Sequence, residues 1–122
     1  MTQKLKAMSD AQLVSRFADI CIVQDQALLR DELDRFNSLF REMRAVSNEL
    51  KGRAGDQRRA LLALYSHPNF QVRLKAAKAT LAVAPQAARA ELQGIKDKGP
   101  LPQAGEAGMC LWTLEQGIFK PK

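Results

Sequence analysis

The stretch LLALYSHPNFQVRLKAAKATLAVAP, residues 61–85, decides the fold class of this chain. Asn69 follows a His-Pro break and is a residue type that commonly caps the start of a helix. The positions after it predict a helix with two apolar faces, Phe70, Leu74, Ala77 and Leu81 on one and Val72, Ala76, Ala79 and Val83 nearly opposite. Such a helix must be covered on both sides, so we expect only its polar strips to reach water.

The residues before this stretch predict two further helices. Ser9, with Gln12 three residues later, forms a capping-box pattern that starts the first helix. One unbroken helix from Ser9 to Lys51 would be about 65 Å long, so we expect two antiparallel helices with a break near residues 24–28. The second helix carries an apolar stripe and stops at Gly52. The stripe consists of Leu29, Leu33, Phe36, Phe40, Met43 and Leu50.

The remaining segments complete an all-helical pattern. Gly55 and Asp56 form a turn and cap before a short third helix, Pro85 suits the first turn of a fifth, and a sixth stops at Gly117. No segment shows the strict alternation of a strand. We therefore predict the all-α class with about six helices. The expected layout is a single domain over residues 1–122, with an N-terminal helical pair at about 9–52, two helix-pair repeats at about 55–117 and a tail at 118–122.

The positive charge of the chain is concentrated in its second half. The chain has 19 Lys and Arg against 13 Asp and Glu, a net charge of +6. Residues 1–50 hold seven basic and eight acidic side chains, whereas residues 51–122 hold twelve and five. We expect an exposed strip of Gln71, Lys75 and Lys78, whose lysines join Arg58, Arg59 or Lys51 in a positive groove for an acidic partner. The alternative is an ordinary solvated helix face.

The sequence does not indicate catalytic or metal chemistry. His67, the single histidine, precedes Pro68 in the predicted turn, where a structural or solvent-exposed role is expected. Cys21 and Cys110 lie among apolar neighbours without a metal-binding spacing, so we expect reduced core thiols. No Gly-rich phosphate loop or nucleophile elbow occurs. We predict a protein that is not an enzyme and that uses neither a metal nor a cofactor.

The sequence also gives an expectation for location. The first ten residues lack the apolar run of a signal peptide, and the longest apolar run, residues 20–23, is far too short to span a bilayer. We expect no membrane partner and, by default, a cytoplasmic location.

Residues 61–85 resemble a HEAT repeat. The resemblance rests on the leucines of the first helix, the Pro68-Asn69 turn, Val72-Arg73 and the paired Ala76-Ala77. In HEAT proteins these positions are structural, and the inner helices commonly line a concave surface that binds other macromolecules. The resemblance implies an armadillo-like α-α superhelix. The N-terminal pair departs from the pattern, because its long second helix bears no proline turn.

A longer pattern adds a second resemblance. Residues 61–85, together with PQAGEAGMCLWTLEQGIFKP at 102–121, are similar to a small family of bacterial proteins known only as a domain of unknown function. This resemblance implies a helical fold and no particular role.

The expected function is that of a non-catalytic protein-interaction or regulatory module. Met109 and Trp112 lie on an outer face of the last helix, where they bind a partner or a second copy of the chain, unless Ile118 and Phe119 fold back over them. Nucleic acid is an alternative partner, less favoured because no aromatic residue is interleaved with the basic ones. An immunity-type protein that neutralises one partner is a further alternative.

Overall fold

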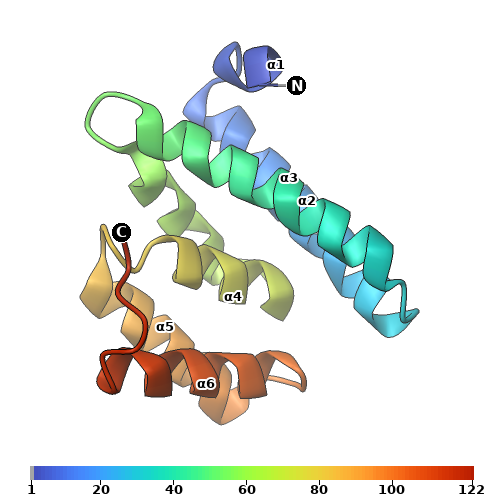
Figure 1. Ribbon diagram of the computed structural model, residues 1–122, viewed down its shortest axis with the longest axis vertical. Helices are drawn as coiled ribbons and strands as arrows, with labels where there is room; N and C mark the ends of the chain where they lie inside the picture. The colour runs from blue at the N-terminus through green and yellow to red at the C-terminus, as the bar shows by residue number, and fades with distance from the viewer. Residues whose placement is uncertain (1) are drawn as a thin grey trace. The chain divides into compact units, whose positions relative to one another are not determined.

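The computed structural model describes residues 2–122, and the fold is all-helical, as predicted (Figure 1). Residues 2–122 contain no strand. None of the helices described is both long and apolar enough to cross a membrane. The elements are α1 (Thr2–Lys6), α2 (Asp10–Leu29), α3 (Leu33–Gly52), the 3₁₀ helix η1 (Gln57–Ser66), α4 (Phe70–Ala79), α5 (Pro85–Lys98) and α6 (Gln103–Glu115).

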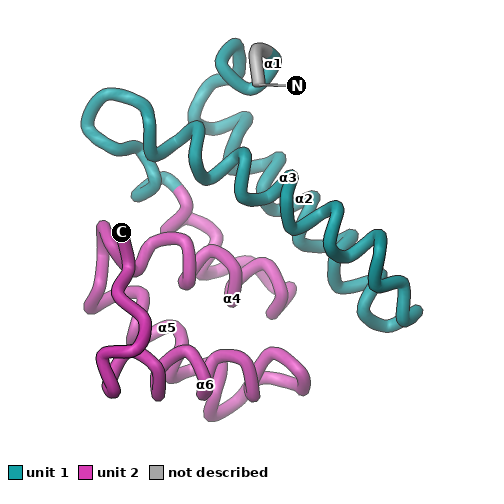
Figure 2. Tube along the Cα trace, in the orientation of Figure 1, with its two compact units in different colours: residues 1–60 teal, residues 61–122 magenta. Residues whose placement is uncertain are grey.

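The chain divides into two compact units, Met1–Ala60 and Leu61–Lys122 (Figure 2). The boundary falls inside η1, so unit 1 contains α1 to α3 and unit 2 contains α4 to α6. The single-domain layout and the repeat boundaries stay predictions.

Unit 1 is built on the antiparallel pair α2 and α3 (Figure 1). The start of α2 is the predicted capping box: Ser9 Oγ accepts a hydrogen bond from the Gln12 N–H at 3.1 Å, and the Gln12 side chain accepts one from the Ser9 N–H at 2.8 Å. In the core of the unit, Cys21 Sγ lies 3.8 Å from Met43 Sδ. Cys21 and Cys110 are both buried free thiols, as predicted.

The predicted break at residues 24–28 is wrong, because α2 continues to Leu29 and α3 begins only at Leu33. The turn between them contains Asp31 with a φ of +58°, a left-handed conformation that Asp tolerates better than most residues with a Cβ. The sequence around the turn has neither Gly nor Pro, so the usual signals of a helix end are missing.

The predicted apolar stripe is only partly right. Met43 and Leu50 are buried, but Leu33 and Phe40 are exposed, and Leu29 belongs to α2 and is 83% exposed. Val46, which the stripe omits, is buried. Leu29 and Leu33 flank the turn of the helix pair, and α1 packs on α3 near its other end, so α1 does not cover them.

Arg53 fastens the short helix α1, which the sequence analysis does not predict, to the α2–α3 pair. Its guanidinium donates hydrogen bonds to Asp10 Oδ1 at 2.7 Å and to Glu49 Oε2 at 2.9 Å. It also donates to the backbone carbonyl oxygens of Leu5 at 3.1 Å and Met8 at 2.6 Å. One side chain therefore fixes the corner between α1 and α2 against the end of α3.

Unit 2 packs α4, α5 and α6 around one apolar core. The cap of α4 is the predicted one, because Asn69 Oδ1 accepts hydrogen bonds from the N–H groups of Gln71 at 2.8 Å and Val72 at 3.2 Å. Pro85 begins α5, and Gly117 follows α6 with a φ of +71°, as predicted. The buried core residues are Leu74, Ala77, Leu81, Ala88, Leu92, Ile95, Ala107, Cys110 and Leu114.

Both apolar faces of α4 are buried along its middle, as predicted, whereas Phe70, Ala79 and Val83 are half-buried, and Leu81 and Val83 lie beyond the end of α4 at Ala79. Leu74 and Ala77 on one face and Val72 and Ala76 on the other have no exposed surface. Arg73 holds α4 against α5, because its Nε donates to Glu91 Oε2 at 2.8 Å and its guanidinium lies 4.6 Å from the centre of the Phe70 ring.

The third predicted helix is the 3₁₀ helix η1. Gly55 and Asp56 make the turn before it, with φ values of +77° and +49°. Asp56 Oδ1 accepts a hydrogen bond from the Arg58 N–H at 3.3 Å, so Asp56 caps the helix as predicted. At the other end of η1, the Tyr65 hydroxyl lies 2.5 Å from the buried Thr80 hydroxyl after α4. The HEAT-repeat interpretation of η1 and α4 stays a prediction.

Candidate functional site

The polar strip of α4 faces α6 instead of water. Lys75 Nζ lies 2.7 Å from Glu106 Oε2, and Lys78 Nζ lies 3.0 Å from the same oxygen. Gln71 Oε1 accepts a hydrogen bond from Gln103 Nε2 at 2.9 Å. Because Gln71 is 2% and Lys75 5% exposed, the predicted exposure of the strip is wrong for these two residues. The periodicity of α4 shows that the strip is polar, but it cannot show that α6 brings polar partners to it.

Glu106 balances part of the positive charge of this cluster. Burial opposes ionisation of the Glu106 carboxyl, but the ammonium groups of Lys75 and Lys78 outweigh it and hold the pKa of Glu106 below its usual value. Cys110 lies one turn further along α6, and burial raises the pKa of its thiol although Lys78 acts in the opposite direction. The cluster is thus a contact between α4 and α6 in which one carboxylate balances one of two positive charges, with Lys78 as its partly exposed member.

Arg58 and Arg59 differ from each other in their surroundings. Arg58 is buried, whereas Arg59 is exposed. Arg58 donates two hydrogen bonds to the carboxylate of Asp56, from Nε to Oδ1 at 2.9 Å and from Nη2 to Oδ2 at 2.7 Å. These hydrogen bonds hold the pKa of Asp56 below its usual value. Arg58 and Arg59 belong to unit 1 and the lysine pair to unit 2, so a groove that combines them stays a prediction.

The outward surface of α6 is apolar and exposed. Met109 is 62% and Trp112 51% exposed, and the side chain of Leu101 is exposed beside Gly105, where an added Cβ would lie 3.9 Å from Leu101 Cδ2. On a helix, Gly105, Met109 and Trp112 point within about 60° of one another. We call Leu101, Gly105, Met109 and Trp112 the α6 face.

The C-terminal tail does not close the α6 face. The N–H groups of Ile118 and Phe119 both donate to the Thr113 carbonyl oxygen, at 3.0 and 3.2 Å, which turns the chain at the end of α6. Ile118 and Phe119 are themselves exposed, and Trp112 keeps half of its surface open. The covering of Met109 and Trp112 by the tail, one of the two expectations, is therefore not found.

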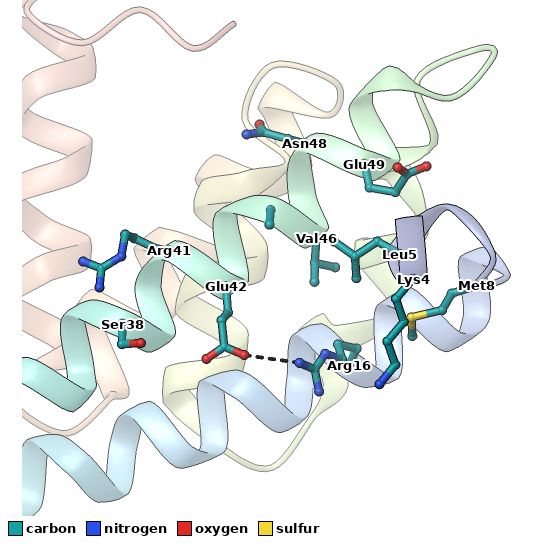
Figure 3. Close-up of a pocket in the computed structure, with 11 residues that line it drawn as sticks. Lys4, Leu5, Met8, Arg16, Ser38, Arg41, Glu42, Val46, Asn48 and Glu49 are labelled. Atoms are coloured by element: carbon teal, nitrogen blue, oxygen red, sulfur yellow. Dashed lines mark hydrogen bonds and ion pairs between the residues drawn. The ribbon is translucent and has the colours of Figure 1, made fainter. Parts of the chain in front are cut away.

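A groove in unit 1, which no sequence pattern predicts, lies between α3 and the corner of α1 and α2 (Figure 3). Its volume is about 750 Å³. The apolar side chains at the groove are Leu5, Met8, Ala45 and Val46, and the basic ones are Lys4, Arg16 and Arg41. We call it the α3 groove. Sequence reasoning could have found it only by recognising residues 4–8 as a helical corner that packs on α3.

Comparison with known proteins identifies the family. Residues 11–115 match the model of a family described as a domain of unknown function, DUF2019. The chain belongs to this family. A similar solved structure is the crystal structure of the protein RPA1889 from Rhodopseudomonas palustris CGA009, with 53% sequence identity and a TM-score of 0.94 over 97% of this chain and 98% of that chain. A search of curated proteins finds no match.

The DUF2019 match confirms the predicted family, and the similar solved structure, at a TM-score of 0.94, has the same fold. The family match covers the cluster of Lys75, Lys78 and Glu106 and all of the α6 face. It begins after Lys4, Leu5 and Met8, which form one wall of the α3 groove.

Proposed function

We propose that this DUF2019 protein is a non-catalytic protein-interaction module whose contact surface is the α6 face. The observation that carries the proposal is the exposure of Met109 and Trp112 side by side on one helix, at 62% and 51%. Large apolar side chains that gather on the surface mark interaction sites, and tryptophan is among the residue types that contribute most to binding energy.

The surroundings of the α6 face favour an acidic partner. The stem of Lys96 lies beside Gly108 on α6, where an added Cβ would meet Lys96 Cδ at 3.6 Å. An apolar centre with a basic side chain at its edge is the arrangement that an acidic protein surface complements. A nucleic-acid partner is less favoured, because its phosphates need basic side chains to contact, and Lys75, Lys78 and Arg58 already form ion pairs with carboxylates of the chain itself.

Two observations support the non-catalytic part of the proposal. Burial of Cys110 raises the pKa of its thiol, which disfavours the thiolate that a nucleophile needs. His67 Nδ1 accepts a hydrogen bond from the Asn69 N–H at 3.0 Å, so this ring nitrogen serves the turn before α4. Cytoplasmic location belongs to the same proposal.

The test is affinity capture from the native host with three forms of the chain: the natural sequence, Trp112→Ala, and Gln93→Ala as an exposed control on α5. We expect a partner that is retained by the first and third forms and lost with Trp112→Ala. Capture of the same partner by all three forms would remove the α6 face from the proposal.

Light scattering over a range of concentrations decides whether the partner is a second copy. We expect a second copy, if it is the partner, to appear as a dimer of the natural chain and a monomer of Trp112→Ala. A monomer of the natural chain at every concentration excludes self-association and leaves a different protein.

A further inference from the structure

We infer that the α3 groove binds a small amphipathic anion, a hydrocarbon body that carries one carboxylate or a similar anionic group. The site lies in unit 1 and is separate from the α6 face, so this inference does not depend on the proposed protein interaction.

The size of the groove suits a small molecule. Its volume of about 750 Å³ lies within the range of ligand pockets, roughly 300–1,000 Å³. The residues that α3 contributes run from Ser38 to Glu49, which corresponds to about 16 Å along the helix. A hydrocarbon chain of about ten carbons is shorter than this length when extended, at roughly 1.3 Å per carbon by covalent geometry.

The apolar side chains collect toward the α1 end of the groove. Leu5 and Met8 come from the corner of α1 and α2, and Val46 comes from the part of α3 that they approach (Figure 3). Val46 is buried, whereas Leu5 and Met8 are partly exposed and Ala45 is exposed. A hydrocarbon body laid over Leu5, Met8 and Ala45 would remove their apolar surface from water, which is the main favourable term of such binding.

The charges of the groove favour an anion. Both carboxylates of the groove form ion pairs with arginines: Glu42 Oε1 is 3.2 Å from Arg16 Nη2, and Glu49 Oε2 is 2.9 Å from Arg53 Nε. Lys4 and Arg41 are exposed cations of the lining, and neither forms an ion pair with another residue in the described part of the chain. The groove therefore carries positive charge that an anionic ligand can balance.

The two cations lie on different elements of the groove. Arg41 lies on α3 on one side of Glu42, and Lys4 lies on α1 on the other side, next to Leu5 (Figure 3). Ser38 and Asn48 add hydrogen-bonding side chains to the lining. The anionic group of a ligand thus finds cationic and neutral polar partners at the rim, while the hydrocarbon body of the ligand covers the apolar side chains of the groove.

The walls of the groove are held in place before any ligand arrives. Arg53 donates to the carbonyl oxygens of Leu5 and Met8, and it also binds Asp10 on α2 and Glu49 on α3. These contacts fix the corner that supplies the apolar wall, which reduces the ordering that a ligand would otherwise have to impose.

The experiment follows backbone amide chemical shifts of the full chain during titration with decanoate, decanol and decylamine. We expect decanoate to shift the amides of Leu5, Ala45 and Val46 in a saturable way, with weaker binding of decanol and the weakest binding of decylamine. Amides of α6 provide the internal control for binding to the exposed apolar surface of unit 2. Equal affinity for the three probes, or shifts confined to α6, would overturn the inference.

Two variants place the ligand within the groove. Combined Lys4→Glu and Arg41→Glu should weaken decanoate binding by about tenfold or more, which corresponds to the loss of a charged contact or two. Arg44→Glu is the matched control, because Arg44 is an exposed arginine on α3 that does not line the groove, and we expect it to change affinity much less.

Ala45→Trp adds a large side chain to the lining of the groove at an exposed position and should abolish saturable binding while the chain stays folded. Ala90→Trp, at an exposed position on α5, is its control. Binding of decanoate that survives Ala45→Trp, or that Arg44→Glu weakens as much as the double variant does, contradicts the inference.

Discussion

Lys75 Nζ lies 2.7 Å from Glu106 Oε2, and the lysine side chain is only 5% exposed. Lys78 reaches the same oxygen from the next turn of α4. A single carboxylate of α6 thus accepts hydrogen bonds from two cations of α4 and compensates the burial of one of them. The contact is a structural link within unit 2, and the stability of the unit should depend on it.

Glu106→Gln should destabilise the chain, because it removes the carboxylate charge that lies 2.7 Å from the buried ammonium of Lys75. We expect a loss of about 2 kcal/mol in the free energy of unfolding, less than for a fully buried pair because water reaches part of Glu106. Urea denaturation measures it. Glu115→Gln, on the exposed side of the same helix, is the control and should change the free energy by less than about 0.5 kcal/mol.

The double variant Lys75→Met, Glu106→Gln separates the charge effect from packing. An apolar side chain of similar length removes the buried charge, so most of the stability lost in Glu106→Gln should return. If the double variant is as unstable as Glu106→Gln alone, the buried ammonium is not the cause.

The stability of the chain should fall in acid partly because of Glu106. The folded chain lowers the pKa of this carboxyl, so its contribution is fully present above the unfolded pKa of glutamate, about 4.3, and is lost as the pH falls through the lower folded value. The difference in free energy of unfolding between the natural chain and Glu106→Gln should therefore shrink as the pH falls below about 4. A difference that stays constant down to pH 2 would contradict this origin.

Tyr65 should resist ionisation at high pH. Burial raises the pKa of its phenol, although its contact with Thr80 acts in the opposite direction. Tyr65 is the only tyrosine of the chain, so the ultraviolet absorbance of tyrosinate reports this residue alone. We expect the native chain to titrate above the ordinary tyrosine value of about 10 and the urea-unfolded chain to titrate near it. Identical midpoints would show that the phenol is solvated in the folded chain.

The sequence predicts the helical elements that have local signals. Ser9 Oγ and Asn69 Oδ1 accept hydrogen bonds from N–H groups in the first turns of α2 and α4, Pro85 begins α5, and Gly117 follows α6. Each of these groups acts within a few residues of its own position, so its role follows from the sequence alone. The turn at Asp31 lacks such a signal, because Asp31 adopts the left-handed backbone conformation that glycine usually adopts at the end of a helix.

The candidate site is less predictable because it depends on contacts between distant segments. The spacing of Gln71, Lys75 and Lys78 shows one polar strip, but Gln103 and Glu106 lie about thirty residues away and cover it. For Met109 and Trp112, the spacing along α6 predicts the outer face on which they lie but not whether the tail covers it, and the structure shows both side chains exposed. Pairing of polar groups across helices is the information that periodicity does not contain.

The fluorescence of Trp112 should report the state of the α6 face. Trp112 is the only tryptophan, and half of its surface is open in the single chain. We expect acrylamide to quench it readily in dilute solution and less readily when a partner or a second copy covers the face. Resistance to quenching in a chain shown to be monomeric would mean that the tail or another segment already covers the ring.

Arg53→Lys should loosen α1 without unfolding the α2–α3 pair. The natural guanidinium contacts Asp10, Glu49 and the carbonyl oxygens of Leu5 and Met8 at once, whereas a lysine keeps the charge but cannot reproduce this planar set of donors. We expect amide hydrogen exchange in residues 2–8 to approach the rate of unstructured chain, while the amides in the middle of α3 stay protected. Arg44→Lys, an exposed change on the same helix, should leave both regions as they are.

Because Leu5 and Met8 form the apolar wall of the α3 groove, Arg53→Lys should also weaken decanoate binding, although Arg53 itself does not line the groove. Fast exchange in residues 2–8 with unchanged decanoate affinity would mean that this wall does not contribute to the site.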